Sequence, residues 1–456
     1  MKEKKVFDAI TNLPDPMVME AEEYINHKKK RRRVLFASLA ACAVLVFGAA
    51  GLGIQKVGTG VEAIIKVTYP KAYAYDDYDT RSEIREKNPV EESFLSAVQG
   101  FAWRTSSVFL KDKKENVNYS PLSLYYALSL AASGAEGETA AELLCLLGVE
   151  DQEQLSSQCS NLYRLLYADN KIGKCKIANS LWLSKDITFQ PDYVKNAAEK
   201  FYAPAYYVDF ADKKTTEAMA KWIADNTNGV LQPELKENTE SLMTILNTIY
   251  YKNEWVDCFD KDKTKTDTFY LSDGSTVECD YMNRTYNSAG FSKGTNYTMS
   301  RLSLKYFGSM VFILPDEGVS LDELLEEEKL KEIFEAEDNG YGEVVWQVPK
   351  FDFGSKFDMA KELQALGVRD AFDEKEADFS RITEEMAYIS DIRQETHISI
   401  DEKGVEAAAF TQIDYAGAGL PQDRADMILN RPFLYAIETF DGIPIFIGIC
   451  ENPTER

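Results

Sequence analysis

Histidine decides which acid–base chemistry this chain of 456 residues could perform, because the sequence contains only two. His27 precedes a run of six cations, and His397 lies in the alternating segment ETHISI. A Ser-His-Asp triad beyond that run would have to use His397, and a metal site built from several histidines is excluded. The alternating pattern predicts a strand in which His397 is a hydrogen-bonded structural side chain.

Other motifs of catalysis and ligand binding do not occur either. The chain has no G-x-S-x-G elbow, Walker loop, H-E-x-x-H pair or complete G-x-G-x-x-G. The acidic run DELLEEEK at 322–329 lacks the alternating ligands and central glycine of a calcium loop, which favours a solvated helix face. We therefore expect no enzymatic activity, no cofactor and no metal ion.

The cysteines fit a structural role. None belongs to a Cys-x-x-Cys pair, which argues against a zinc ribbon and a thioredoxin-like motif. Their simplest interpretation is a set of small buried hydrophobic residues, and their pairing stays open. They stand at positions 42, 145, 159, 175, 258, 279 and 450.

Charge argues against a nucleic-acid partner. The formal net charge is −24, and the only strongly basic run is Lys28–Arg33. A surface that binds phosphate backbones must offer lysine and arginine, and the acidic remainder of the chain does not supply them in excess.

A hydrophobic segment directly follows the basic run. Val34–Ile54 contains 21 residues without a charge, and at about 1.5 Å per residue it spans a hydrocarbon core of about 30 Å. It predicts a single transmembrane helix in the cell membrane. The preceding cations place residues 1–33 in the cytoplasm and everything after Ile54 outside. A cleaved signal peptide and lipid attachment at Cys42 remain open as alternatives.

The rest of the chain divides into a linker and a folded body. Residues 55–87 mix Tyr, Asp and Lys without an apolar period, which predicts a linker or stalk. From residue 88 to residue 456 periodicity predicts a folded domain. Its first helix has Phe94, Val98, Phe101 and Ala102 at helical spacing. Strand patterns follow at 310–315, 343–353, 397–400 and 443–450, so helices precede strands and an α+β fold is favoured.

Six segments in chain order resemble the serpin family of serine protease inhibitors, from about residue 88 to the end. They are NVNYSPLSLYYALSLAASGAEGETAAELLCLLG (116–148), WIADNTNGVL (222–231), LNTIYYKNEWVDCF (246–259), VPKFDF with ADFSRITEE (348–353 and 377–385), IDEKGVEAAAFT (400–411) and NRPFLYAIETFDGIPIFIGICENP (430–453). The resemblance implies a helical N-terminal half, a large central β-sheet, smaller second sheets and a mobile reactive loop.

The resemblance also implies a mechanism. A target serine protease cleaves the loop and forms a covalent acyl complex, and the loop then inserts as an extra strand into the central sheet. We therefore expect a monomer that acts as a suicide substrate, with the protease as its covalent partner.

The alanine-rich stretch near the C-terminus matches the hinge of that loop. In a strand alternate residues share a face, so Val405, Ala407 and Ala409 would be buried on insertion, with Val405 first. The family often has Thr or Ser where this chain has Val405, and Phe410 is large for its position. The resemblance assigns the hinge to Glu402, Gly404, Val405, Glu406, Ala407, Ala408 and Ala409.

The resemblance also suggests where the loop is cut. Counting from Gly404 places the cleaved bond between Ala418 and Gly419, and a small residue there points to elastase-like or subtilisin-like proteases. Cleavage between Tyr415 and Ala416 is the alternative and would favour chymotrypsin-like proteases.

Further positions carry over from the resemblance as structural expectations. Ser120, Ser123 and Asn247 match polar residues of the sheet-opening region, and Gln394 stands where the family usually has a histidine. Any pH dependence of sheet opening through that position is therefore in doubt. At the top of the sheet, Lys350 and Glu402 match an ion pair and Trp255 matches a nearby aromatic residue.

Together these features predict a membrane-tethered inhibitor of extracellular serine proteases. Two alternatives stay open. The chain could be a non-inhibitory serpin that serves as a binding or structural protein. It could also be a transmembrane sensor whose tail, residues 1–33, binds a cytoplasmic partner.

Overall fold

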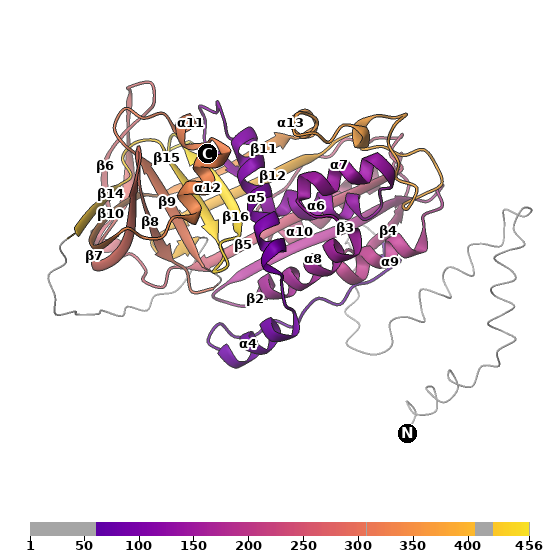
Figure 1. Ribbon diagram of the computed structural model, residues 1–456, viewed down its shortest axis with the longest axis horizontal. Coiled ribbons are helices and arrows are strands. Elements are labelled where there is room, and N and C mark those ends of the chain that lie inside the picture. Colours follow the sequence, from indigo (N-terminus) through magenta and orange to yellow (C-terminus); the bar gives the residue numbers. More distant parts are fainter. Residues whose placement is uncertain (1–60, 307, 406–422, 456) are drawn as a thin grey trace, which may run out of the picture. The chain divides into compact units, whose positions relative to one another are not determined.

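The computed structural model describes residues 61–306, 308–405 and 423–455 (Figure 1). The chain divides into two compact units, Met1–Ile54 and Gln55–Arg456, and all described residues belong to the second. The predicted membrane helix Val34–Ile54 and the tail before it lie outside these residues. Within the described part, no helix combines the length and the apolarity that crossing a bilayer requires.

Helices form most of the N-terminal half of the body, as predicted. α5 (Glu92–Phe109) buries Phe94, Val98, Phe101 and Ala102, the four residues that the helical spacing singles out. α6 (Pro121–Ala132) begins after Ser120, whose hydroxyl accepts from the Ser123 amide, and this helix is buried on nearly all sides. The other helices of this half are α7 (Gly137–Leu147), α8 (Gln152–Leu166), α9 (Pro191–Lys200) and α10 (Lys213–Asn226).

A large sheet lies against these helices, with α6 and α10 touching its strand β5 and α8 touching β3 (Figure 1). Its strands in spatial order, as far as the structure describes them, are β11 (Phe351–Asp358), β12 (Arg393–Asp401), β13 (Gly404–Val405), β5 (Met243–Glu254), β3 (Lys174–Ser184) and β2 (Ala168–Asp169), and β4 (Ala205–Val208) also pairs with β3. The predicted strand at 397–400 is part of β12.

A second sheet contains most of the C-terminal strands. Its spatial order among the described residues is β1 (Val117–Tyr119), β16 (Pro444–Cys450), β15 (Phe433–Glu438), β9 (Ser309–Pro315), β8 (Tyr297–Ser303), β7 (Thr276–Gly294), β10 (Gly340–Pro349) and β14 (Asp423–Ile428), with β6 (Lys265–Tyr270) on β7. The predicted strands at 310–315 and 443–450 are confirmed as β9 and β16. The predicted strand at 343–353 is divided at Lys350, because β10 pairs in this sheet and β11 in the large one.

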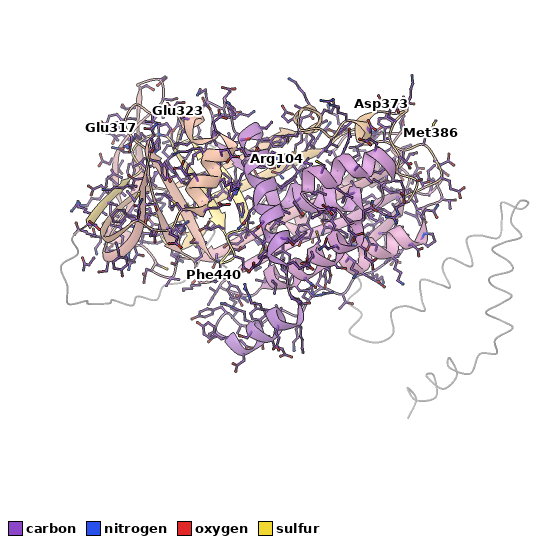
Figure 2. The ribbon with its side chains drawn as sticks, in the orientation of Figure 1. Arg104, Glu317, Glu323, Asp373, Met386 and Phe440 are labelled. Carbon is purple, nitrogen blue, oxygen red and sulfur yellow. The ribbon has the colours of Figure 1, made fainter. Side chains whose placement is uncertain are left out.

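The acidic run at 322–329 turns its leucines inward and its carboxylates outward, as the helix-face interpretation predicts. α11 (Leu321–Leu324) and α12 (Glu327–Glu335) bury Leu324 and Leu330. Arg104 of α5 points toward α12, with its Nε 3.4 Å from Glu327 Oε1 (Figure 2). The remaining short helices are η1 (Lys261–Lys263), α13 (Ala360–Ala365) and η2 (Asp370–Phe372).

The described cysteines behave as the sequence predicts. Those at 145, 159, 175, 258, 279 and 450 are all free thiols, and every one except Cys145 is buried. Burial raises the pKa of the Cys159 thiol to about 12, so it stays protonated at neutral pH. The five buried cysteines therefore serve as small apolar groups in the core.

The segment predicted to be a linker packs on the body where the structure describes it. We call residues 61–77 the strap, and α4 (Tyr78–Lys87) follows it. Ala63 is buried beneath α10, and the backbone of Ile65 forms an antiparallel bridge to Ala205 of β4. Tyrosines, which make the segment look polar by composition, supply large apolar rings that pack on the core.

Candidate functional site

The predicted hinge begins as a two-residue strand held between two long strands. β13 pairs with β12 through Val405 and Ile400, and with β5 through Val405 and Asn253. Gly404 pairs with Asp401 on one side and with Glu254 on the other. No direct pairing of β12 with β5 occurs in the described structure, so β13 is their one described hydrogen-bonded link. A strand longer than β13 could therefore continue between the same two neighbours.

Close packing explains why the first residue of this strand is glycine. A Cβ added at Gly404 would lie 2.1 Å from the carbonyl oxygen of Asn253 and 2.7 Å from the Cα of Glu254. These are backbone atoms of β5, which a side-chain rotation cannot move away. Gly404 thus lets the hinge approach β5 closely enough to pair with it.

Val405 is already buried, with 3% of its surface exposed. The sequence predicts that this side chain becomes buried when the loop inserts, and the structure differs because β13 is seated between β5 and β12 beforehand. Glu406, Ala407, Ala408 and Ala409 lie outside the described residues. The proposed cleavage sites, Ala418–Gly419 and Tyr415–Ala416, also lie outside them.

The predicted ion pair and aromatic residue come together directly before the hinge. Lys350 Nζ lies 3.2 Å from Glu402 Oε1, which also accepts from the Thr264 hydroxyl at 2.9 Å. Trp255 is buried, and its indole N–H donates to the carbonyl of Asp401 at 2.9 Å. The backbone of β12 is therefore fixed immediately before the turn into β13.

Hydrogen bonding sets the charge state of Glu402. Burial alone raises the pKa of this carboxyl, but donors from its own backbone N–H, from Thr264 and from the Lys350 ammonium outweigh burial. The net result is a pKa below the ordinary value of 4.5. The Glu402 carboxylate is consequently charged at neutral pH.

The predicted sheet-opening residues also meet, at the N-terminus of α6. Gln394 accepts from the backbone N–H of Ser120 at 2.8 Å and donates to its carbonyl at 2.9 Å. The Ser123 hydroxyl donates to the side-chain oxygen of Asn247, whose amide donates to Asn179 Oδ1 at 2.6 Å. These contacts tie α6 to β12 on one side and to β5 and β3 on the other.

Two buried asparagines of this region were not among the predicted residues. Asn179 of β3 completes the contact chain just described, and Asn253 of β5 holds the backbone of Tyr306. Both are fully buried although their side chains are polar, and a buried polar side chain needs a specific partner. β3 and β5 contain other polar residues as well, so their sequences do not single these two asparagines out.

His397 has the structural role that its strand pattern predicts. Its Nε2 lies 2.8 Å from Asp352 Oδ1 on the neighbouring strand β11. Within the described residues, no hydroxyl hydrogen-bonds to this imidazole, so the nucleophile of a triad is missing there.

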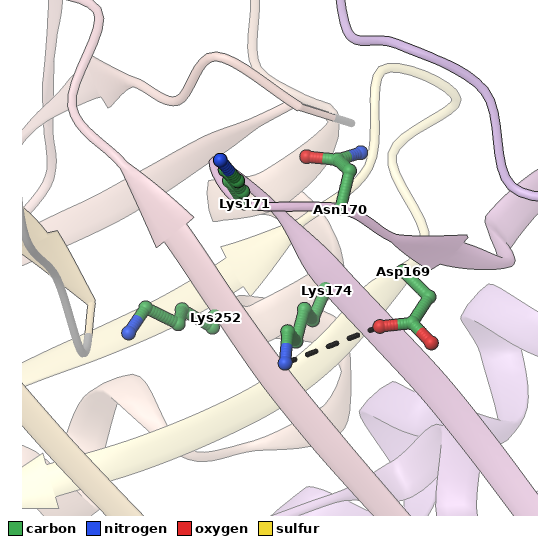
Figure 3. A pocket seen from close by; sticks show the side chains of 5 residues that line it. All are labelled: Asp169, Asn170, Lys171, Lys174 and Lys252. Atoms are coloured by element: carbon green, nitrogen blue, oxygen red, sulfur yellow. Dashed lines mark ion pairs between the residues drawn. The ribbon is translucent and has the colours of Figure 1, made fainter.

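An open hollow of about 410 Å³ lies beside the C-terminal end of β5. Figure 3 shows Lys174 and Lys252 on neighbouring strands, with Asn170 and Lys171 on the turn between β2 and β3. Lys174 Nζ is 4.0 Å from Asp169 Oδ1. The lining is charged and polar, unlike the mostly apolar lining of a typical cofactor pocket. The described residues also contain no cluster of three or more side chains that could hold a metal ion.

Comparisons with known proteins agree with this geometry. The sequence profile of a family described as Serpin (serine protease inhibitor) matches residues 96–453. Serpin-Z7 of Hordeum vulgare is 30% identical over 381 residues, which cover 77% of this chain and 94% of that protein.

Solved structures give the same result. The native state of tengpin, a thermophilic serpin, matches with a TM-score of 0.72 and 28% identity over 85% of this chain and 97% of that chain. Serpin48 of the insect Tenebrio molitor, described as highly specific, matches with a TM-score of 0.70 and 26% identity over 79% of this chain and 98% of that chain.

Proposed function

This chain belongs to the serpin family, whose members in general are protease inhibitors and not enzymes, and we propose that it inhibits extracellular serine proteases while tethered to the cell membrane. The observation that carries the proposal is β13. Its two residues are paired on both sides, and the chain continues from Val405 into the alanine-rich segment 406–409. A strand started in this way supports a mechanism in which the remaining loop extends it.

The proposed reaction begins as ordinary proteolysis of the loop. The serine Oγ of the protease attacks the carbonyl carbon of Ala418, the bond to the Gly419 nitrogen breaks, and that nitrogen leaves with a proton. The protease then remains attached to Ala418 through an ester. Cleavage after Tyr415 would form the same ester three residues earlier.

Insertion then competes with hydrolysis of that ester. Every residue that joins β13 hydrogen-bonds to the main chain of β5, β12 or both, which is the gain that drives strand addition. The three alanines at 407–409 present little side-chain bulk to the neighbouring strands. Movement of the tethered protease with the inserted strand distorts its active site, so the ester persists.

Membrane tethering is supported by the segment before the body. Val34–Ile54 has the length and apolarity of a membrane helix, and Lys28–Arg33 supplies the positive charges that favour a cytoplasmic N-terminus. A body fixed in this way would meet only proteases that reach the outer face of the cell membrane. The proposed targets are accordingly extracellular elastase-like, subtilisin-like or chymotrypsin-like enzymes.

The test of inhibition uses the full-length chain in detergent micelles. It is mixed with elastase, subtilisin and chymotrypsin in turn, and the products are separated in SDS. A complex of the summed mass that survives SDS supports the proposal, and mass spectrometry of the released C-terminal peptide identifies the cleaved bond. Complete cleavage without such a complex for all three proteases would contradict inhibition of these protease classes.

A non-inhibitory serpin is the second candidate, favoured by the large Phe410 and by Val405 at a position where a smaller polar residue is common in the family. The same experiment separates the two, because a non-inhibitory serpin is cleaved without trapping. The sensor hypothesis concerns residues 1–33. It predicts that a peptide of these residues captures a specific cytoplasmic protein, whereas an inhibitor needs none.

A further inference from the structure

We propose that Tyr306 is a positioning residue for the hinge, through which the strap holds the C-terminal end of β5 in register for β13. This inference rests on the proposed function, since the hinge matters only if the loop inserts. It is carried by a continuous set of contacts that runs from the strap through Tyr306 and Asn253 to Val405.

The first part of this connection joins the strap to Tyr306. The Tyr306 hydroxyl donates to the carbonyl of Tyr73 at 2.9 Å, and the two rings lie 6.1 Å apart between centroids. The ring of Tyr75 is 6.4 Å away, and the Arg81 guanidinium sits 5.8 Å from the centre of the Tyr306 ring. Arg81 also donates to the carbonyl of Tyr75 at 3.3 Å, which fixes the strap around the ring.

The second part joins Tyr306 to β5. The Asn253 side chain accepts from the Tyr306 backbone N–H at 3.1 Å and donates to the Tyr306 carbonyl. It therefore hydrogen-bonds to both backbone groups of one residue. Asn253 is fully buried, and its amide also donates to the Tyr251 hydroxyl at 2.8 Å. The neighbouring residues form a second connection, in which Lys305 Nζ lies 2.7 Å from the buried carboxylate of Glu254.

The third part joins β5 to the hinge. Asn253 and Glu254 are the two residues of β5 that pair with Val405 and Gly404. Gly404 approaches them so closely that a Cβ has no room. A displacement of this end of β5 by a fraction of an ångström would therefore disturb the pairing on which strand extension starts.

The strap also contacts β4, Tyr167 and Asn170, so it is fixed to the body independently of Tyr306 and can hold this residue in place. It bridges to Ala205 of β4, and Tyr69 stacks on Tyr167 with ring centroids 6.3 Å apart. Asn170, on the rim of the hollow in Figure 3, donates to the carbonyl of Tyr73 at 3.4 Å. Burial raises the pKa of Tyr306 to about 12, so its hydroxyl remains a donor at neutral pH.

The test compares Tyr306→Phe with Tyr126→Phe in the full-length chain. Tyr126→Phe is the matched control, because it also removes a buried hydroxyl that donates to a carbonyl, that of Cys159 at 2.8 Å, within the helical region. Amide hydrogen exchange is followed in peptides that contain Asn253 and Val405. We expect Tyr306→Phe to speed exchange there about five- to tenfold, the effect of one lost hydrogen bond. The control should leave these peptides unchanged.

Two further measurements make the outcome decisive. Arg81→Gln removes the guanidinium that lies over the Tyr306 ring and donates to the carbonyl of Tyr75, and it should speed hinge exchange in the same direction while it leaves the Tyr306 hydroxyl in place. With a protease that the wild type traps, Tyr306→Phe should raise the number of inhibitor molecules consumed per protease while the rate of initial cleavage stays the same. Unchanged exchange at Asn253 and Val405 in Tyr306→Phe overturns this inference. Failure of the wild type to trap any protease would instead count against the proposed function. The exchange measurement would still decide whether Tyr306 positions the hinge.

Discussion

At the scale of single residues, Val405 is the side chain whose substitution tests insertion most directly. It is buried between β5 and β12, so Val405→Arg places a charge without a partner in that site. Because this site is buried before cleavage, such a charge costs several kcal/mol in the uncleaved protein and displaces β13 from its seat. The loop must then reseat this residue in order to insert, and about 1.4 kcal/mol added to that barrier slows insertion tenfold. We expect the variant to be cleaved as a substrate without trapping the protease, measured as the stoichiometry of inhibition.

The control for Val405→Arg is Glu406→Arg. Residue 406 follows Val405 and faces the opposite side of an inserted strand, since side chains alternate. Its substitution should change the stoichiometry much less. If Val405→Arg traps protease as efficiently as the wild type, loop insertion at this site is not the mechanism.

Glu402 provides a prediction about pH. Its pKa lies below the ordinary 4.5, because hydrogen bonds and Lys350 outweigh the opposing effect of burial. A lowered carboxyl pKa stabilises the fold above about pH 4.5, and this contribution is lost as the pH falls through the folded-state value. Glu402→Gln should therefore lower the free energy of unfolding by about 1–3 kcal/mol at pH 7.

Urea denaturation of both proteins at pH 7 and below pH 4 measures this difference, which should shrink at the lower pH. Glu395→Gln is the control, because Glu395 is only partly buried and its partner Lys356 is exposed, so this ion pair should contribute little. An equal loss for Glu402→Gln at both pH values would show that its charge is not the cause.

At the scale of secondary-structure elements, Gln394 joins β12 to the start of α6. Its side chain accepts from one backbone group of Ser120 and donates to the other, which a neutral amide does at any pH. A histidine here could do the same only while neutral, because a protonated imidazole cannot accept. The wild type should thus have no pH dependence from this contact.

Gln394→His should introduce that dependence. Since the site favours the neutral imidazole, its folded-state pKa falls below the ordinary value of about 6.5, and stability is lost as the pH drops below that value. Thermal unfolding between pH 8 and pH 5 should show a falling midpoint for the variant relative to the wild type. Gln394→Met, which loses both hydrogen bonds at every pH, should be destabilised by a constant amount across this range.

The elements also show what the sequence could and could not predict. Periodicity located α5 and β12, because each repeats apolar residues at the spacing of its own geometry, whereas continuous apolar runs located β9 and β16. Periodicity joined β10 and β11 into one strand, because apolar and polar residues alternate on both sides of Lys350, although the buried positions change there from even-numbered to odd-numbered residues. The strap has the sequence pattern of a linker, because its tyrosines pack on the body through their rings and its backbone through hydrogen bonds, and neither leaves an apolar period.

The candidate site also contains residues that the sequence predicts and contacts that only the structure shows. The resemblance supplied Ser120, Asn247, Gln394 and the pair Lys350–Glu402, and the structure brings each set into contact. The link from Asn253 to Tyr306 joins residues 53 positions apart, and Tyr306 lies outside all the segments that carry the family resemblance. The seating of β13 depends on pairing among three strands, which a single strand pattern does not contain.

At the scale of the whole molecule, the final prediction concerns the membrane. If Val34–Ile54 spans the bilayer, full-length protein in closed membrane vesicles of known sidedness should resist extraction by alkaline carbonate. An epitope tag at the C-terminus should be accessible from the extracytoplasmic side and one at Met1 only from the cytoplasmic side. Replacing Lys28–Arg33 with glutamine should weaken or invert this orientation, because those charges carry the orienting signal.

Each alternative gives a different result in the same vesicles. A cleaved signal peptide would release a shortened protein that lacks the Met1 tag and washes off with carbonate. A lipid anchor at Cys42 would be lost in Cys42→Ala, which leaves a membrane helix intact because alanine is apolar and small. A body accessible only from the cytoplasmic side would contradict the proposed targets, since extracellular proteases could not reach the loop.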